Sequence, residues 1–397
     1  MPPSPLADRL TLHFDAELHR RLIGRTEVII HCHHYNARLQ RVVEEAAAID
    51  GKALLVRCAE AAFAQFLARV IDAGDPIDTR WQMAGDLYAH LGFGRLDFAE
   101  VAGGVVRAPS SHFVEGWRAC HSVQRSSVCS MTEGYLQAAV AVATGRPAHV
   151  REAECMFTGA PACRFEIDTT RTGGLESYER HPVPAAHGAS GTSRISSPTV
   201  DEAKIVRALV EMPIRGNAHG LIPAFNVYLA NTPADFYNLL AIRFVEEMER
   251  VQMGDIARRL LFDCAEACAM NTFRGILASA EWEALIAPMV REPADSLFGL
   301  IAVSNALGWG DWHVVEHVAE QRLTLASRNG YEATGFAEMR GAGSSPVCVM
   351  LAGVSAGIME LLYGRGTVQD RLGQYGGVET ACRCRGEPEC VFLSEAR

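Results

Sequence analysis

The sequence predicts an α+β protein built from two copies of one domain, each with helices packed on a small antiparallel sheet. The main observation is a repeated cysteine pattern. From Cys129 to Cys163 the chain has the spacing Cys-x25-Cys-x7-Cys, and from Cys348 to Cys390 it has Cys-x33-Cys-x7-Cys. In both places a glutamate precedes the middle cysteine by three residues, and Gly-x-Pro-x-Cys-x-Phe ends the pattern. A shared pattern of this length indicates an internal repeat.

The segment 169–200 divides the chain. It is rich in Gly, Ser, Thr and Pro and has no periodic apolar positions, which is typical of a flexible linker. The predicted domains are therefore residues 1–168 and 201–397. With 49% apolar and 21% charged residues, each has the composition of a globular domain with its own core.

Further matches extend the repeat to both whole halves. Tyr35-Asn36 matches Tyr237-Asn238, and the Cys-Ala-Glu-Ala motif at Cys58 recurs at Cys264. The distance between matched residues grows from 202 at these tyrosines to 227 at the last cysteines. Such growth is expected if the second copy has small loop insertions in a shared fold.

The elements of each copy follow from apolar spacing and turn residues. In the first copy, apolar residues at helical spacing between Leu39 and Ile49 predict a helix. A second helix contains Cys58, and a third ends near Gly92, which would cap it. One or two short strands follow, then a helix from Cys129 to the stop signal at Gly145, and a final hairpin.

Three thiols and a carboxylate would meet where this helix begins and the hairpin turns. Such a set forms a closed tetrahedral zinc site, which has no open position for a substrate and is structural. The alternative is that the thiols are small buried residues of the core. The predicted donors are Cys129, Glu152, Cys155, Cys163, Cys348, Glu379, Cys382 and Cys390.

This cysteine pattern, with Gly134-Tyr135 after the first cysteine, resembles the 4-vinyl-reductase-like domain. That domain occurs in bacteriochlorophyll biosynthesis proteins, archaeal hydrocarbon-binding proteins and the sensor half of phenol- and xylene-responsive bacterial activators. The resemblance is strongest over residues 110–168 and returns over 330–394. It implies a fold similar to subunits of the TRAPP complex and zinc held by the eight donors above, two structural ions per chain. This chain differs in having two copies and no ATPase or helix-turn-helix region, and Cys384 leaves the second donor set ambiguous.

His31-Cys32-His33-His34 is a cluster that the repeat does not reproduce. The aligned residues 233–236 include no histidine. As a strand after Val28, the cluster would place His31 and His33 on one face and His34 on the other. His31, His33 and His34 are therefore the candidates for acid–base catalysis or a further metal. The alternative is a hydrogen-bonded histidine group at a sheet edge or helix cap.

The candidate ligand-binding residues are Trp81, Trp117, Tyr135 and His33. The resemblance implies an apolar cavity lined by aromatic side chains, which we place in the first copy, with the second copy as its structural partner. The alternative is that these aromatic residues pack in the core, because Trp117 has an aromatic counterpart, Phe336, in the second copy.

Composition limits the partners. A formal charge of −10 argues against binding to nucleic acid, and no apolar run is long enough to span a membrane. The N-terminus does not read as a signal peptide, so we expect twelve reduced cysteines and a cytoplasmic location. The sequence has no P-loop or dinucleotide fingerprint.

The predicted function is that of a zinc-stabilised protein that binds or senses a small apolar or aromatic molecule. The alternative is an enzyme acting on a small aromatic or tetrapyrrole-like substrate through His31, His33 and His34. A protein-interaction scaffold is a third possibility, suggested by the TRAPP-like fold. The two copies would form an intramolecular pseudo-dimer, or the chain a homodimer.

Overall fold

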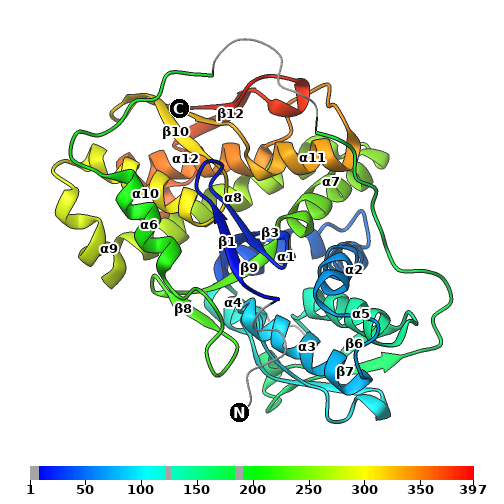
Figure 1. The fold of residues 1–397 in the computed structure, drawn as a ribbon. Helices are drawn as coiled ribbons and strands as arrows, with labels where there is room; N and C mark the ends of the chain where they lie inside the picture. The colour runs from blue at the N-terminus through cyan, green and yellow to red at the C-terminus, as the bar shows by residue number, and fades with distance from the viewer. Residues whose placement is uncertain (1–8, 122–126, 184–190) are drawn as a thin grey trace.

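The computed structural model of the chain describes residues 9–121, 127–183 and 191–397. It contains three antiparallel sheets with helices packed around them (Figure 1). This confirms the predicted α+β class. None of the helices in the described ranges is both long and apolar enough to cross a lipid bilayer.

The first half begins with a hairpin and a strand, continues with three helices, and ends with a sheet interrupted by two more helices. Its elements are β1 (Leu12–Asp15), β2 (Arg20–Ile23), β3 (Thr26–Cys32), α1 (His33–Glu44), α2 (Gly51–Val70), α3 (Ile77–His90), β4 (Gly94–Asp97), η1 (Val101–Gly103), β5 (Val105–Ser111), α4 (His112–Cys120), α5 (Ser130–Thr144), β6 (His149–Glu154), η2 (Met156–Thr158) and β7 (Cys163–Asp168).

The second half repeats this order with short additions. Its elements are α6 (Glu202–Glu211), β8 (Ile222–Ala224), β9 (Val227–Pro233), α7 (Ala234–Arg250), α8 (Gly254–Leu277), α9 (Ala280–Leu285), η3 (Ala287–Met289), α10 (Pro293–Ala306), β10 (Trp312–Val318), β11 (Arg322–Ser327), α11 (Tyr331–Arg340), α12 (Val349–Tyr363), α13 (Val368–Arg371), β12 (Tyr375–Ala381), η4 (Arg383–Arg385) and β13 (Cys390–Ala396).

Each half has its own four-stranded sheet with the same strand order, β4-β5-β7-β6 in the first and β10-β11-β13-β12 in the second. The helix that starts at the metal-motif cysteine packs on the helix with the Cys-Ala-Glu-Ala motif, α5 on α2 and α12 on α8. The added α9 and α13 lie in the intervals where the spacing between matched residues grows. The predicted repeat is therefore a structural one.

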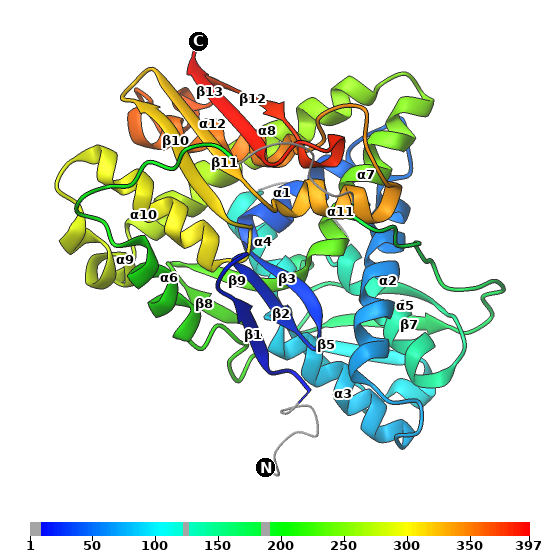
Figure 2. The ribbon, with the colours of Figure 1, turned by 45° about the horizontal axis from the view of Figure 1, so that its top comes forward.

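A third, five-stranded sheet has strands from both halves in the order β1-β2-β3-β9-β8. Figure 2 shows it in the centre of the molecule, between the two halves. At its middle β3 pairs antiparallel with β9, with Ile30 opposite Asn231. Ile30 N–H donates to Leu307 O at 3.0 Å, and Asn231 N–H donates to Leu91 O at 2.8 Å. These matching bonds indicate a local twofold axis near the Ile30–Asn231 pair.

The structure corrects the alignment of the two halves around this sheet. Thr26 and Val227, the first residues of β3 and β9, are 201 positions apart, as are the first residues of α1 and α7. A Cβ atom on Gly116 would meet the side chain of Ala37, whereas one on Gly335 would meet that of Asn238. Ala37 is therefore the counterpart of Asn238, and the Tyr-Asn match that suggested an offset of 202 is wrong by one residue.

The halves also pack against each other through helices. α1 contacts α8 and α7 contacts α2, so each half covers part of the other, and one continuous apolar core includes residues of both. Tyr237 of α7 donates a 2.6 Å hydrogen bond to Asn36 Oδ1 of α1 inside this interface. The predicted domain boundaries stay a prediction, since strands of both halves share one sheet, and homodimer formation also stays a prediction.

Two local expectations are refined. The helix predicted to reach Ile49 ends at Glu44, because the chain turns there and α2 begins with Asp50 as its cap. Gly92 and Gly308 follow α3 and α10 with φ of +92° and +86°, as predicted for glycine caps.

The predicted linker contacts both halves along its described part. Arg171 pairs with Glu60 of α2, and Arg180 pairs with Asp235 of α7. Residues 184–190 of the linker lie outside the described residues.

Replacing Tyr237 by Phe tests the contact between the halves. We expect a loss of about 1–3 kcal/mol in the free energy of unfolding, because the buried Oδ1 of Asn36 would lose its donor. Tyr363→Phe is the control: that hydroxyl contacts His317 in a half-buried position, and its removal should cost less than about 0.5 kcal/mol. Equal denaturation midpoints for the two variants would contradict the prediction.

Candidate metal centres and ligand-binding residues

The four predicted donors of the first half lie together. Cys129 immediately precedes α5, Glu152 lies in β6, Cys155 follows β6 and Cys163 begins β7. All four are buried, and their ligand atoms lie within 4.8 Å of one another. The Sγ atom of Cys163 is 3.8 Å from that of Cys129 and 4.0 Å from that of Cys155.

The second half repeats this arrangement with Cys348, Glu379, Cys382 and Cys390, which also are buried with ligand atoms within 4.8 Å of one another. The Sγ atoms of Cys348 and Cys390 are 3.7 Å apart. Cys384 Sγ lies 3.3 Å from Cys382 Sγ but is not part of the four-donor group. Two buried Cys3Glu clusters that fit a metal ion are thus present, one in each half.

The spacing of the donors fits a tetrahedral metal. Zn–S bonds of about 2.3 Å place two thiolates of a tetrahedron about 3.8 Å apart. Glu152 Oε2 accepts the N–H groups of Val128 and Cys129, while its Oε1 is buried without a hydrogen-bond partner. In the second half Glu379 Oε2 accepts the N–H of Cys348, and its Oε1 likewise has no partner. One free carboxylate oxygen therefore remains in each cluster as a fourth ligand.

Local backbone geometry positions these donors. In each half the strand with the glutamate has a bulge just after it, between Glu152 and Glu154 and between Glu379 and Ala381. A bulge changes the direction of side chains next to it. After the middle cysteine a 3₁₀ turn ends at a glycine with positive φ, Gly159 in the first half, which returns the chain to the last cysteine.

Burial makes the clusters hostile to free negative charge. It raises the pKa of Glu152 to about 8, with the Cys155 thiolate adding to the effect, and it raises the pKa of Cys129 well above its usual value. In the second half burial likewise raises the pKa of Glu379 to about 8 and that of Cys348. Four acidic groups so close together all lose their protons only if a cation compensates their charge.

The histidine cluster is divided by the end of a strand. β3 ends at Cys32 and α1 begins at His33, so the predicted strand placement of His33 and His34 is wrong. His31 lies among aromatic rings, with centroid distances of 4.2 Å to Tyr35 and 4.9 Å to Trp309. Both its ring nitrogens are buried without a partner among the described residues.

His33 and His34 lie elsewhere, with their ring centroids 4.0 Å apart. Tyr228 N–H donates to His33 Nδ1 at 3.1 Å, and His112, which the sequence did not single out, is 6.3 Å from His33. Burial lowers the pKa of His31 to about 3 and that of His33 to about 4. Both imidazoles are therefore neutral at pH 7, whereas efficient acid–base catalysis needs a pKa near the working pH.

The predicted ligand-binding residues lie in separate groups. Trp81 stacks on Phe98, and Tyr135 donates to Ala84 O at 2.6 Å. Trp117 contacts His121, whereas His33 is near Tyr228. The structure does not bring the four together, and the larger described cavities have other linings. Their role in binding stays a prediction, with core packing as the alternative.

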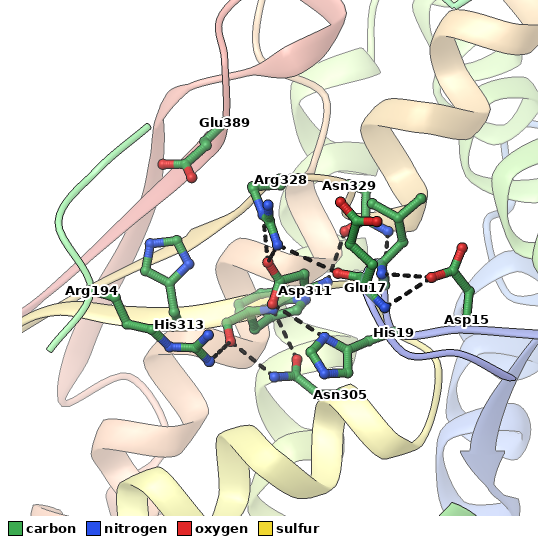
Figure 3. Close-up of polar contacts among 12 residues, drawn as sticks. Asp15, Glu17, His19, Arg194, Asn305, Asp311, His313, Arg328, Asn329 and Glu389 are labelled. Atoms are coloured by element: carbon green, nitrogen blue, oxygen red, sulfur yellow. Dashed lines mark hydrogen bonds and ion pairs between the residues drawn. The ribbon is translucent and has the colours of Figure 1, made fainter. Parts of the chain in front are cut away.

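A polar cluster that no motif indicated joins the N-terminal hairpin and the linker to the second half (Figure 3). At its centre the buried Asp311 accepts a 2.6 Å hydrogen bond from Arg328, and its other oxygen lies 3.1 Å from His19 Nδ1. Asn329 donates to Leu18 O at 2.7 Å, at the tip of the hairpin. These residues are far apart in the sequence, so only the fold reveals the cluster.

The linker joins the same cluster. Thr192 Oγ1 lies 3.0 Å from His313 Nε2, and it donates to Glu389 at 2.7 Å. Arg194 lies beside Trp312 O at 3.5 Å. The cluster is fully occupied by contacts within the chain, which indicates a structural role.

Comparison with known proteins matches residues 113–169 to the vinyl-4-reductase domain, the 4-vinyl-reductase-like domain of the sequence analysis. The match contains all four donors of the first cluster and confirms the predicted domain in the first half. A solved structure with similarity to the chain is the phenol-responsive sensory domain of the transcription activator PoxR with phenol, at 22% identity, with a TM-score of 0.35 and coverage of 42% of this chain and 87% of that one. No curated protein matches the chain.

Substituting single cysteines tests the metal clusters. Cys163→Ser should lower the metal content from two ions per chain to one, because the first cluster would lose a thiolate, and Cys390→Ser should do the same in the second. Cys384→Ser is the matched control and should keep both ions. Elemental analysis of the purified chain measures this, and a Cys384→Ser protein with one ion would show that the second donor set is misassigned.

Asp311→Asn tests the hairpin cluster and its pH dependence. Burial acts to raise the pKa of Asp311, but hydrogen bonds from His19 and Arg328 outweigh it and lower the pKa below its usual value. The charged carboxylate therefore stabilises the fold above about pH 4 and loses this effect as the pH falls through the lowered pKa. We expect the variant to be about 1–3 kcal/mol less stable at pH 7. That difference should shrink at about pH 3.5 in denaturant titrations, and one independent of pH would contradict the assignment.

Proposed function

We propose that this chain is a zinc-stabilised protein that binds a small apolar or aromatic molecule, in order to sense or deliver it. The observation that supports the proposal most is the 4-vinyl-reductase-like domain match of residues 113–169, which spans a complete donor cluster. The sequence pattern of that segment resembles the ligand-binding half of aromatic-responsive activators.

Zinc is the metal that the donor set favours. Three thiolates and one carboxylate, buried and tetrahedrally spaced, suit zinc, and four protein ligands leave no position for substrate. In each half the ion would connect the start of one helix, α5 or α12, to the final hairpin. Because α5 packs on α2 and α12 on α8, this connection would stabilise the helix layer between the halves.

The enzyme alternative gains no support from the geometry. His31 lies among aromatic rings away from His33 and His34, and burial keeps His31 and His33 neutral. A ligand pocket in the first half, lined by Trp81, Trp117, Tyr135 and His33, remains a proposal. It requires these packed side chains to move apart.

The first test is elemental analysis and thermal unfolding of the full chain purified without added metal. We expect two zinc ions per chain and an increase in the unfolding temperature with apolar one-ring compounds such as toluene or benzyl alcohol, since a ligand at about 100 times its Kd adds about 2.7 kcal/mol of stability. Another metal would contradict the zinc assignment. No shift with any apolar compound would contradict the binding function.

A further inference from the structure

The second half contains a cavity of about 260 Å³ that the described part of the first half does not have. It lies between α7, α8, α11 and the segment before α12. Its lining consists of Asn238, Ala241, Ile242, Val245, Glu246, Glu249, Arg258, Leu261, Glu332, Phe336, Ser344, Ser345, Pro346, Val347 and Val349.

The equivalent place in the first half is almost filled. There Leu55, Phe113 and Gln40, the counterparts of Leu261, Glu332 and Ala241, border a space of only about 10 Å³. Gln40 donates to Glu44 at 2.9 Å and to Val128 O at 3.0 Å, and Ser130 donates to Glu44 at 2.5 Å. Among the described residues of that half, these bonds join α1 to the start of α5 across the groove.

The second half has lost every side chain of this polar contact. Ala241, Val245 and Val349 occupy the positions of Gln40, Glu44 and Ser130. Alanine is smaller than glutamine, and no member of the apolar set forms a hydrogen bond between side chains. Consequently the groove stays open and its walls become apolar.

Asn238 adds a polar group that the first half does not have, because its counterpart is Ala37. It is 4% exposed, and its Oδ1 has no hydrogen-bond partner among the described residues. An unsatisfied buried acceptor costs about 1–3 kcal/mol, and a bound molecule with a hydrogen-bond donor would remove that cost. Its presence in an otherwise apolar lining suggests a ligand contact rather than a packing role.

The charges around the cavity are mainly negative. Glu332 is buried and accepts the N–H groups of Met350 and Leu351, whereas Glu246 and Glu249 pair with Arg340 and Arg258. Arg258 has Asp255 as a second partner. A negatively charged ligand would therefore meet repulsion.

We infer that this second-half cavity binds an uncharged apolar molecule of about one aromatic ring that carries a hydrogen-bond donor. A cavity of about 150 Å³ accommodates benzene, so 260 Å³ leaves room for a ring with a short substituent. The inference rests on the proposed binding function and places its site in the half that the sequence interpretation treated as a structural partner.

The test uses the full, metal-loaded chain and isothermal titration with benzyl alcohol, toluene, benzoate and benzylamine. Benzyl alcohol should bind with one site per chain, about three- to tenfold more tightly than toluene and at least about tenfold more tightly than benzoate. Asn238→Ala should remove its advantage over toluene. The triple variant Ala241→Gln, Val245→Glu, Val349→Ser installs the first-half contact and should weaken binding at least about tenfold.

Gln40→Ala, at the first-half counterpart of Ala241, is the matched control and should bind as the parent chain does. Metal content and unfolding temperature show whether each variant is folded, and Asn238→Ala decides the question if the triple variant is not. Benzyl alcohol binding that survives both sets of changes, or that Trp117→Phe abolishes instead, would overturn the second-half site but keep the binding function. Tighter binding of benzylamine would overturn the ligand class, and no binding of toluene or benzyl alcohol would overturn both proposals.

Discussion

The antiparallel pairing of β3 with β9 is the constraint on which the rest of the structure depends. Because these strands come from different halves, the pairing places α1 on α8 and α7 on α2, and it buries Asn36 against Tyr237. Neither half has a closed core of its own, since residues of both contribute to one apolar cluster. The repeat thus functions as one folded unit with local twofold symmetry.

The two metal clusters lie far from that axis of pairing and perform a local task. Each gathers donors from a helix start and from both strands of a hairpin, in a segment too short to bury much apolar surface. A divalent ion would offset the electrostatic cost of burying three thiols and a carboxylate. Identical donor sets in both halves indicate that this requirement belongs to the fold rather than to one site's chemistry.

Symmetry makes the differences between the halves informative. With the same backbone arrangement, the first half closes the groove beside its first long helix by a glutamine, a glutamate and a serine, and the second half leaves it open with smaller apolar residues. The open groove also contains the buried amide of Asn238. Function in this chain is therefore more plainly visible in what distinguishes the copies than in what they share.

The sequence alone determined the fold class, the repeat and all eight metal donors, because these depend on local spacing that survives loop insertions. It also suggested the family resemblance later matched over residues 113–169. The tertiary structure decided the register of the halves, where Ala37 rather than Asn36 corresponds to Asn238, and it separated His31 from His33 at the end of β3. It also placed Asp311 beside His19 and revealed the second-half cavity. These features depend on contacts between residues far apart in the chain, which no local pattern encodes.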